Sequence, residues 1–258
     1  NSGNLAAIPI TDNDQWQKSS IDAFVFSNLK KKGLLPNGPA SKQVLIRRAY
    51  YGLTGLPPSL EDVNAFVEDN SPNAFEKVVD KLLASDQYGE KWGRHWLDLV
   101  RYAETNGYER DSRKDLIWKY RDYVIRAFNE DKPYDRVIKE QLAGDLLPNA
   151  NKEQILATGF NRNHMITQEG GVIEEEYRVE YVADRTVTTA KTFLGLTVEC
   201  ARCHDHKYDE ISQKDFFNLF DFFNRLDEDG VISYTDKAPK PNIRLDSNLI
   251  KEELPFIK

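Results

Sequence analysis

Two cysteines and a histidine fall within five residues of this sequence, in the order Cys200, Ala201, Arg202, Cys203 and His204. Two thiols at this spacing can add to the two vinyl groups of a haem, and a histidine directly after the second thiol can reach the iron from one face. The pattern therefore predicts one covalently attached haem c, with Cys200 and Cys203 as anchors and His204 as the proximal iron ligand.

Other interpretations of these residues stay open on the pattern alone. A thioredoxin-like redox pair requires a βαβ context, whereas the surrounding sequence has helical periodicity. A structural zinc site requires two further ligands, and the chain has no second cysteine pair to supply them, although His206 could contribute one. Cys200 and Cys203 could form a disulfide or a zinc half-site in a non-haem interaction module, or the five-residue pattern could be a coincidence.

The ligand on the opposite face of the iron decides the function. A strong sixth ligand favours electron transfer, whereas an open position permits chemistry on small molecules. His95 is one candidate for this distal ligand because aromatic and apolar residues share its helical face, namely Trp92, Trp96 and Leu99. The competing interpretation of His95 is a buried histidine with a hydrogen-bond partner.

Met165 is a second candidate for the distal ligand, since it is the sole methionine of the chain. A helix over residues 174–194 would be about 30 Å long and would place Met165 at the wrong end, unless the helix breaks near residues 186–189 or a loop folds back. Met165 could equally fill a gap in the core. His206 lies only two residues from His204 and is interpreted as a surface-loop histidine.

The elements that must position these residues are helices. Apolar residues recur at helical spacing in ten segments, which cover approximately residues 20–33, 44–52, 59–70, 71–84, 88–103, 115–129, 134–146, 154–161, 174–194 and, after a capping box of Ser212 and Asp215, 213–226. No set of alternating strands is present. The sequence predicts a mainly α fold, an irregular multi-helix haem domain with few or no strands.

Length and composition limit the classes of protein to which this chain can belong. The chain has 258 residues, a net charge of -7, 40% hydrophobic and 30% charged residues, which is typical of a globular domain. The acidic balance argues against a nucleic-acid partner, and no stretch approaches the roughly 20 apolar residues that span a bilayer. We expect an N-terminal extension over 1–19, a helical haem-c domain over 20–226, and a linker or following module over 227–258.

Two charged sets have helical spacing. The simplest interpretation is intrahelical ion pairs on solvated faces, and the alternative is a polar pocket beside the haem that binds a sugar or an anion. The first set is Arg94, Asp98, Arg101 and Glu104, and the second is Arg178, Glu180, Asp184 and Arg185.

Four motifs in order resemble the planctomycete-type cytochrome-associated domains. They are Gly52-Leu-Thr-Gly-Leu-Pro-Pro58, Arg94-His-Trp-Leu-Asp-Leu-Val-Arg-Tyr-Ala103, Gly159-Phe-Asn-Arg-Asn-His-Met165 and Gly195-Leu-Thr-Val-Glu-Cys-Ala-Arg-Cys-His-Asp-His-Lys-Tyr-Asp209. The resemblance covers approximately residues 21–227.

The resemblance implies an extracytoplasmic protein, periplasmic or at the cell surface, that is usually part of a longer chain with further modules. It implies haem more firmly than it implies a reaction. We expect an electron-transfer cytochrome domain whose partner is a redox protein or a second cytochrome domain. The alternative is a haem-dependent oxidoreductase that acts on a small molecule or a glycan, in which case carbohydrate is a further partner.

Overall fold

The computed structural model describes residues 7–10, 19–108, 111–233 and 240–241. These residues are mainly helical, and their only β pairings are two isolated bridges, Thr105 with Arg113 and Thr167 with Val231. The predicted mainly α class is confirmed. Within the described residues, none of the helices is long and apolar enough to cross a membrane. The predicted extension over 1–19 lies mostly outside the described residues.

The chain divides into two compact units, one drawn from residues 1–48 and 58–75 and the other from 49–57 and 76–258. The predicted boundaries at 19/20 and 226/227 stay predictions. The first unit contains α1 (Ser20–Lys31), the start of α2 (Lys42–Leu53), and α3 (Leu60–Glu68). The ammonium group of Lys42 joins α2 to the end of α3, because it donates to the backbone oxygens of Val67 at 3.0 Å and Asp69 at 2.6 Å.

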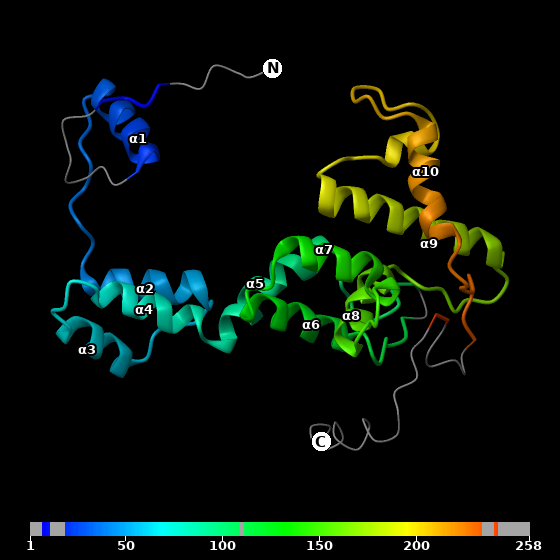
Figure 1. Cartoon of the computed structure of the whole chain (residues 1–258), viewed down its shortest axis with the longest axis horizontal. Helices are drawn as coiled ribbons and strands as arrows, with labels where there is room; N and C mark the ends of the chain where they lie inside the picture. The colour runs from blue at the N-terminus through cyan, green and yellow to red at the C-terminus, as the bar shows by residue number, and fades with distance from the viewer. Residues whose placement is uncertain (1–6, 11–18, 109–110, 234–239, 242–258) are drawn as a thin grey trace. The chain divides into compact units, whose positions relative to one another are not determined.

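All the predicted site residues lie in the second unit, most of whose helices are labelled in Figure 1. After most of α4 (Ala74–Leu83) it comprises α5 (Asp86–Leu99), α6 (Trp118–Asn129), α7 (Tyr134–Ala143), η1 (Gly144–Leu146), α8 (Lys152–Ala157), η2 (Thr158–Arg162), α9 (Glu174–Thr189), the π-helical η3 (Ala190–Leu194), η4 (Glu199–Arg202) and α10 (Gln213–Asn224). Helix α5 packs along α6, and α10 packs on α9.

Two apolar cores hold this unit together. The first surrounds Tyr120 and Tyr123 of α6, with Val100 and Phe160. The second lies between α9 and α10. The ring of Phe193, in η3, reaches the first core, with its centroid 5.2 Å from that of Phe160. The segment formed by α9 and η3 therefore contacts both cores.

The fifth predicted helix, 88–103, ends earlier than expected, at Leu99. Arg101 has a φ of 50°, in the left-handed region that a helix cannot contain. Its guanidinium pairs with Asp184 of α9, and Glu104 pairs with Arg121. The expectation that Arg101 and Glu104 continue the helix as intrahelical partners is therefore wrong, because both form ion pairs with other helices.

The residues that directly follow Asp227 pack as part of the core. The side chains of Glu228 and Ile232 are buried, and the tyrosine hydroxyl of Tyr181 in α9 donates to the backbone oxygen of Gly230 at 2.7 Å. A Cβ atom at Gly230 would overlap the backbone oxygen of Glu174 and lie 2.8 Å from the backbone nitrogen of Arg178. Residues 228–232 thus pack directly on α9.

We expect Gly230→Ala to lower the free energy of unfolding by about 1–3 kcal/mol, because the added methyl group forces the segment off α9. Urea denaturation of purified protein measures this. Gly52→Ala is the matched control: nothing lies within 4 Å of its added Cβ, and alanine favours the helix it occupies. Equal stability of the two variants would contradict the packing of residues 228–232.

Candidate functional site

The predicted haem-attachment residues form one tight turn. Cys200 lies in η4, Cys203 ends it, and His204 follows. Both thiols are free and exposed, and the imidazole of His204 is exposed too. The turn comes after the π-helical η3, which Gly195 ends with a φ of 65° that glycine adopts without strain. The structure therefore presents all three side chains from a single surface segment.

The residues between and around the cysteines fix this turn to the core. The side chain of Ala201 is fully buried between α9 and α10 together with Val198. The guanidinium of Arg202 pairs with Glu180 of α9. The side-chain amide of Gln213, at the start of α10, donates to the backbone oxygen of Arg202 at 3.1 Å. The buried side chain of Ala201 and the ion pair of Arg202 hold the turn on the core, and both cysteines are exposed.

Hydrogen bonds give His204 and His206 different proton positions. The Nδ1 atom of His204 lies 2.7 Å from the backbone oxygen of Asp205. A carbonyl oxygen only accepts, so Nδ1 carries the proton and Nε2 keeps a free lone pair for a metal. In His206, Nδ1 accepts backbone N–H groups from Tyr208 at 3.3 Å and Asp209 at 2.9 Å. Its Nε2 therefore carries the proton when the ring is neutral, so of these two imidazoles His204 is the one whose Nε2 keeps a free lone pair.

This donor set fits a haem c. It offers two unpaired thiols in one turn, an imidazole in the correct tautomer, and flanking apolar side chains at Leu194 and Leu196 that are exposed to solvent. A zinc site requires about four ligands. Across the described residues, no three His, Cys, Asp or Glu side chains come close enough together to hold a metal ion.

The two distal-ligand candidates lie on other elements. His95 is exposed on α5, with its ring centroid 5.4 Å from that of Trp92. Met165 is half exposed and packs on Gly107, with its sulfur 3.1 Å from the position of a Cβ there. Trp96 instead faces the core, where its indole N–H donates to Gln141 at 2.9 Å. His95 and Met165 stay predictions as iron ligands.

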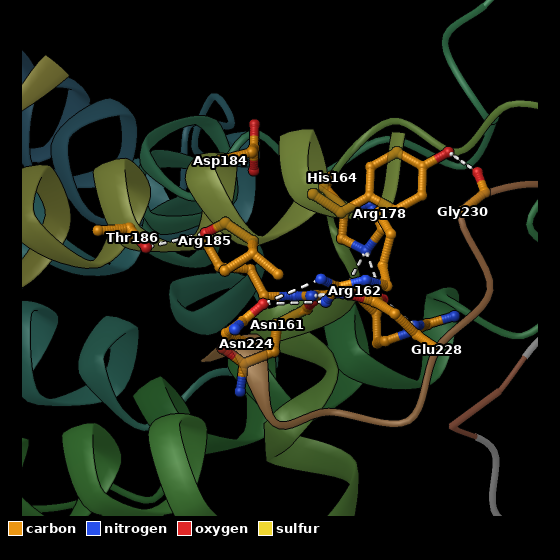
Figure 2. A network of polar contacts seen from close by, with 12 residues as sticks. Asn161, Arg162, His164, Arg178, Asp184, Arg185, Thr186, Asn224, Glu228 and Gly230 are labelled. Atoms are coloured by element: carbon orange, nitrogen blue, oxygen red, sulfur yellow. Dashed lines mark hydrogen bonds and ion pairs between the residues drawn. The ribbon is translucent and has the colours of Figure 1, made fainter. Parts of the chain in front are cut away.

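A buried polar network occupies the other side of α9 (Figure 2). The guanidinium of Arg185 has no exposed surface and forms a two-point ion pair with Glu228, whose side chain is 1% exposed. Its Nε donates to the backbone oxygen of Asn161 at 2.7 Å, and its Nη2 lies 2.7 Å from Nε2 of His164. Arg162 adds a longer contact to Glu228 at 3.3 Å.

His164 is the neutral partner in this network. Burial, followed by the nearby charges of Arg185 and Arg162, holds the pKa of His164 well below its usual value. Its Nδ1 lies 2.8 Å from the backbone oxygen of Met165 and so carries the ring proton. Its Nε2 then accepts from Arg185. This histidine is a hydrogen-bonding group in the core, and its ring stacks on Tyr181 at 4.5 Å.

The expectation of solvated intrahelical pairs on α9 is wrong for most of its charged set. Only Arg178 pairs within the helix, with Glu175. The other three charged residues form ion pairs with other segments, because those segments cover several faces of α9. They are Glu180, Asp184 and Arg185. Sequence reasoning missed Glu228 and the buried, hydrogen-bonding role of His164. The available signal was Arg185 itself, because it lies one turn after Tyr181 among small residues. A buried arginine at that position requires a counter-charge.

The comparisons with known proteins give one match. A family model described as PSCyt2, a protein of unknown function (DUF1549), matches residues 20–228. No curated protein and no solved structure matches the chain. The match covers the residues that carry the predicted resemblance, together with the turn from Cys200 to His204 and the buried network.

We expect Glu228→Gln to lower the free energy of unfolding by about 3–5 kcal/mol, because it leaves the buried charge of Arg185 without its counter-charge. Urea denaturation at pH 7 measures the loss. The control is Glu153→Gln, which breaks an exposed pair with Arg126 and should cost less than about 1 kcal/mol. Similar costs for the two variants would contradict a buried ion pair.

Lys114 gives the network a pH-dependent member. Burial, then the charges of Arg162 and Arg101, lowers the pKa of Lys114 from 10.5 to about 7. The unfolded chain, with its pKa near 10.5, binds more protons between these values, so stability rises with pH across this window. We expect the stability of the wild type relative to Lys114→Met to rise from pH 7 to pH 10, by less than about 1.4 kcal/mol per pH unit. Parallel curves, as expected for the exposed Lys139→Met, would contradict this.

Proposed function

This chain belongs to the PSCyt2 family of proteins of unknown function, and on that premise we propose that it is an extracytoplasmic c-type cytochrome domain that transfers electrons through one covalently attached haem. The observation that carries the proposal is the turn from Cys200 to His204. Two free thiols and an imidazole with an available Nε2 share one exposed segment fixed to the core.

Each residue of the turn has a defined role in this proposal. The thiols of Cys200 and Cys203 add their S–H bonds across the two vinyl groups, which requires no external oxidant. His204 binds iron through Nε2, while the backbone oxygen of Asp205 holds its ring in place through Nδ1. When bound, the haem supplies one-electron transfer. The exposed position of the turn suits exchange with a redox protein or a second cytochrome domain.

Covalent haem is tested by producing the chain in a bacterial periplasm with a haem c maturation system. We expect a pyridine haemochrome spectrum of one haem per chain that stays with the protein after denaturation and acid-acetone extraction. Cys200→Ser/Cys203→Ser should lose the covalent haem because both anchors are absent. His206→Ala, two residues beyond the proximal ligand, should keep it.

Two results would contradict the haem proposal. One is that the wild-type chain acquires no haem under conditions in which a control cytochrome does acquire it. The other is haem that acid-acetone removes from the wild type as easily as from the double serine variant. Thiol titration and metal analysis of the same sample would then identify the disulfide or zinc half-site.

A second candidate function is a haem-dependent oxidoreductase with an open distal position, acting on a small molecule or a glycan. The observation that favours it is the tautomer of His206, whose Nδ1 is already used as an acceptor, so that the loop of the haem turn supplies no second ligand. Carbon monoxide binding to the reduced protein separates the candidates. Rapid binding of carbon monoxide supports the oxidoreductase, and the absence of binding supports the electron carrier. In the second case, carbon monoxide binding that appears in His95→Ala or in Met165→Ala identifies the sixth ligand.

A further inference from the structure

The turn from Cys200 to His204 is tied to the first residue of α10 by two hydrogen bonds. The carboxylate of Asp205 accepts the backbone N–H of Gln213 at 2.8 Å. The side-chain amide of Gln213 donates in return to the backbone oxygen of Arg202 at 3.1 Å. Because His204 lies between the two bonded residues, a single residue of α10 holds the chain on both sides of the proposed iron ligand.

Helix α10 gives these hydrogen bonds a fixed base. The side chains of Phe216, Phe220 and Phe223 bury one face of α10 in the core that it shares with α9. The N–H of Gln213 is one of the first amides of the helix, which have no partner within it. A carboxylate at this end of a helix is also favoured by the helix dipole. Asp205 therefore meets a donor whose position α10 determines.

The backbone of the same Asp205 contacts the imidazole. Its carbonyl oxygen lies 2.7 Å from Nδ1 of His204, while its carboxylate is held by Gln213. Since the carboxylate is fixed, the backbone of Asp205 is restricted in its rotation and its carbonyl stays directed at Nδ1. A hydrogen-bond partner of this kind fixes the tautomer and the orientation of a metal-binding histidine and raises its basicity.

We propose that Asp205 is a positioning residue for the proximal histidine and acts through its side-chain hydrogen bond to Gln213. The effect on the imidazole follows from this chain alone, whereas the effect on iron rests on the proposed haem function. A firm hydrogen bond from Nδ1 makes the imidazole of His204 a better electron donor, which favours ferric over ferrous iron. Asp205 therefore keeps the reduction potential of the bound haem low. A carboxylate that only caps α10 would change stability and leave the imidazole as it is.

The haem-free chain tests the positioning directly. In Cys200→Ser/Cys203→Ser with isotope-labelled histidine, nitrogen chemical shifts at a pH where the imidazoles are neutral report which nitrogen of His204 carries the proton. We expect Nδ1–H in most molecules. Asp205→Ala in this background should move most of the protons to Nε2, the usual tautomer of a free imidazole. Asp205→Asn keeps an oxygen that accepts from Gln213 and should retain Nδ1–H.

Spectroelectrochemistry of the haem-loaded chain measures the consequence for iron. A pyridine haemochrome spectrum first shows that each variant holds one covalent haem. At a given potential, Asp205→Ala should lower the ratio of ferric to ferrous protein about threefold to tenfold, a rise in midpoint potential of about 28–59 mV. Asp205→Asn should stay near the wild type. Glu210→Ala removes the same charge from an exposed position of the same loop and should change the potential less than Asp205→Ala does.

A pair of variants at the other end of the hydrogen bond keeps the test decisive if Asp205→Ala fails to fold. Gln213→Pro removes the N–H that Asp205 accepts, at the first position of a helix, where proline is well tolerated. Gln213→Ala removes the same side chain and keeps the N–H. We expect Gln213→Pro to shift the tautomer and the potential as Asp205→Ala does, and Gln213→Ala to shift them less.

Three results would overturn the positioning role. One is a proton on Nε2 of His204 in the haem-free chain with Asp205 intact. The second is an equal shift in Asp205→Ala and Asp205→Asn, which would assign the effect to lost charge. The third is an unchanged tautomer and potential in Asp205→Ala, which would leave Asp205 as a cap of α10. A wild-type chain without covalent haem would contradict the proposed function instead, and the tautomer of His204 would still test this inference.

Discussion

The buried charge of Arg185 sets the main constraint on this structure. A guanidinium without exposed surface is stable only where a carboxylate meets it, and Glu228 does so from 43 residues further along the chain. That pairing brings residues 228–232 onto α9, and the hydroxyl of Tyr181 fixes their backbone through Gly230. The neighbouring contacts to Asn161 and His164 bring η2 to the same helix. Helix α9 therefore carries the buried contacts that bring η2 and residues 228–232 together.

The turn with the cysteines depends on the opposite side of that helix. Ala201 and Val198 are buried between α9 and α10, and Arg202 pairs with Glu180 of α9. These contacts leave the side chains of Cys200, Cys203 and His204 exposed on a turn that is packed against the core. A surface turn with this support can hold a large planar cofactor without contributing its own side chains to the core. The anchoring residues and the reactive residues alternate within one short segment, so the same local fold serves both purposes.

Several features could be predicted from the sequence because their causes are local. Helical periodicity and capping residues such as Ser212 with Asp215 depend only on neighbours within a few positions. The helix over 174–194 continues through its β-branched residues as expected, with its last turn π-helical. The end of α5 was misjudged because the ion pair of Arg101 with Asp184 joins residues 83 apart, and no local pattern encodes such a partner.

The sequence by itself determined the helical class, the family, and the three residues that could attach a haem, since all of these follow from spacing along the chain. The tertiary structure decided which imidazole nitrogen of His204 is available, because that depends on the backbone oxygen it meets. It also decided that Arg185, His164 and Glu228 share one buried network. Burial and charge balance arise only when distant segments pack together, so they lie beyond any pattern in the sequence.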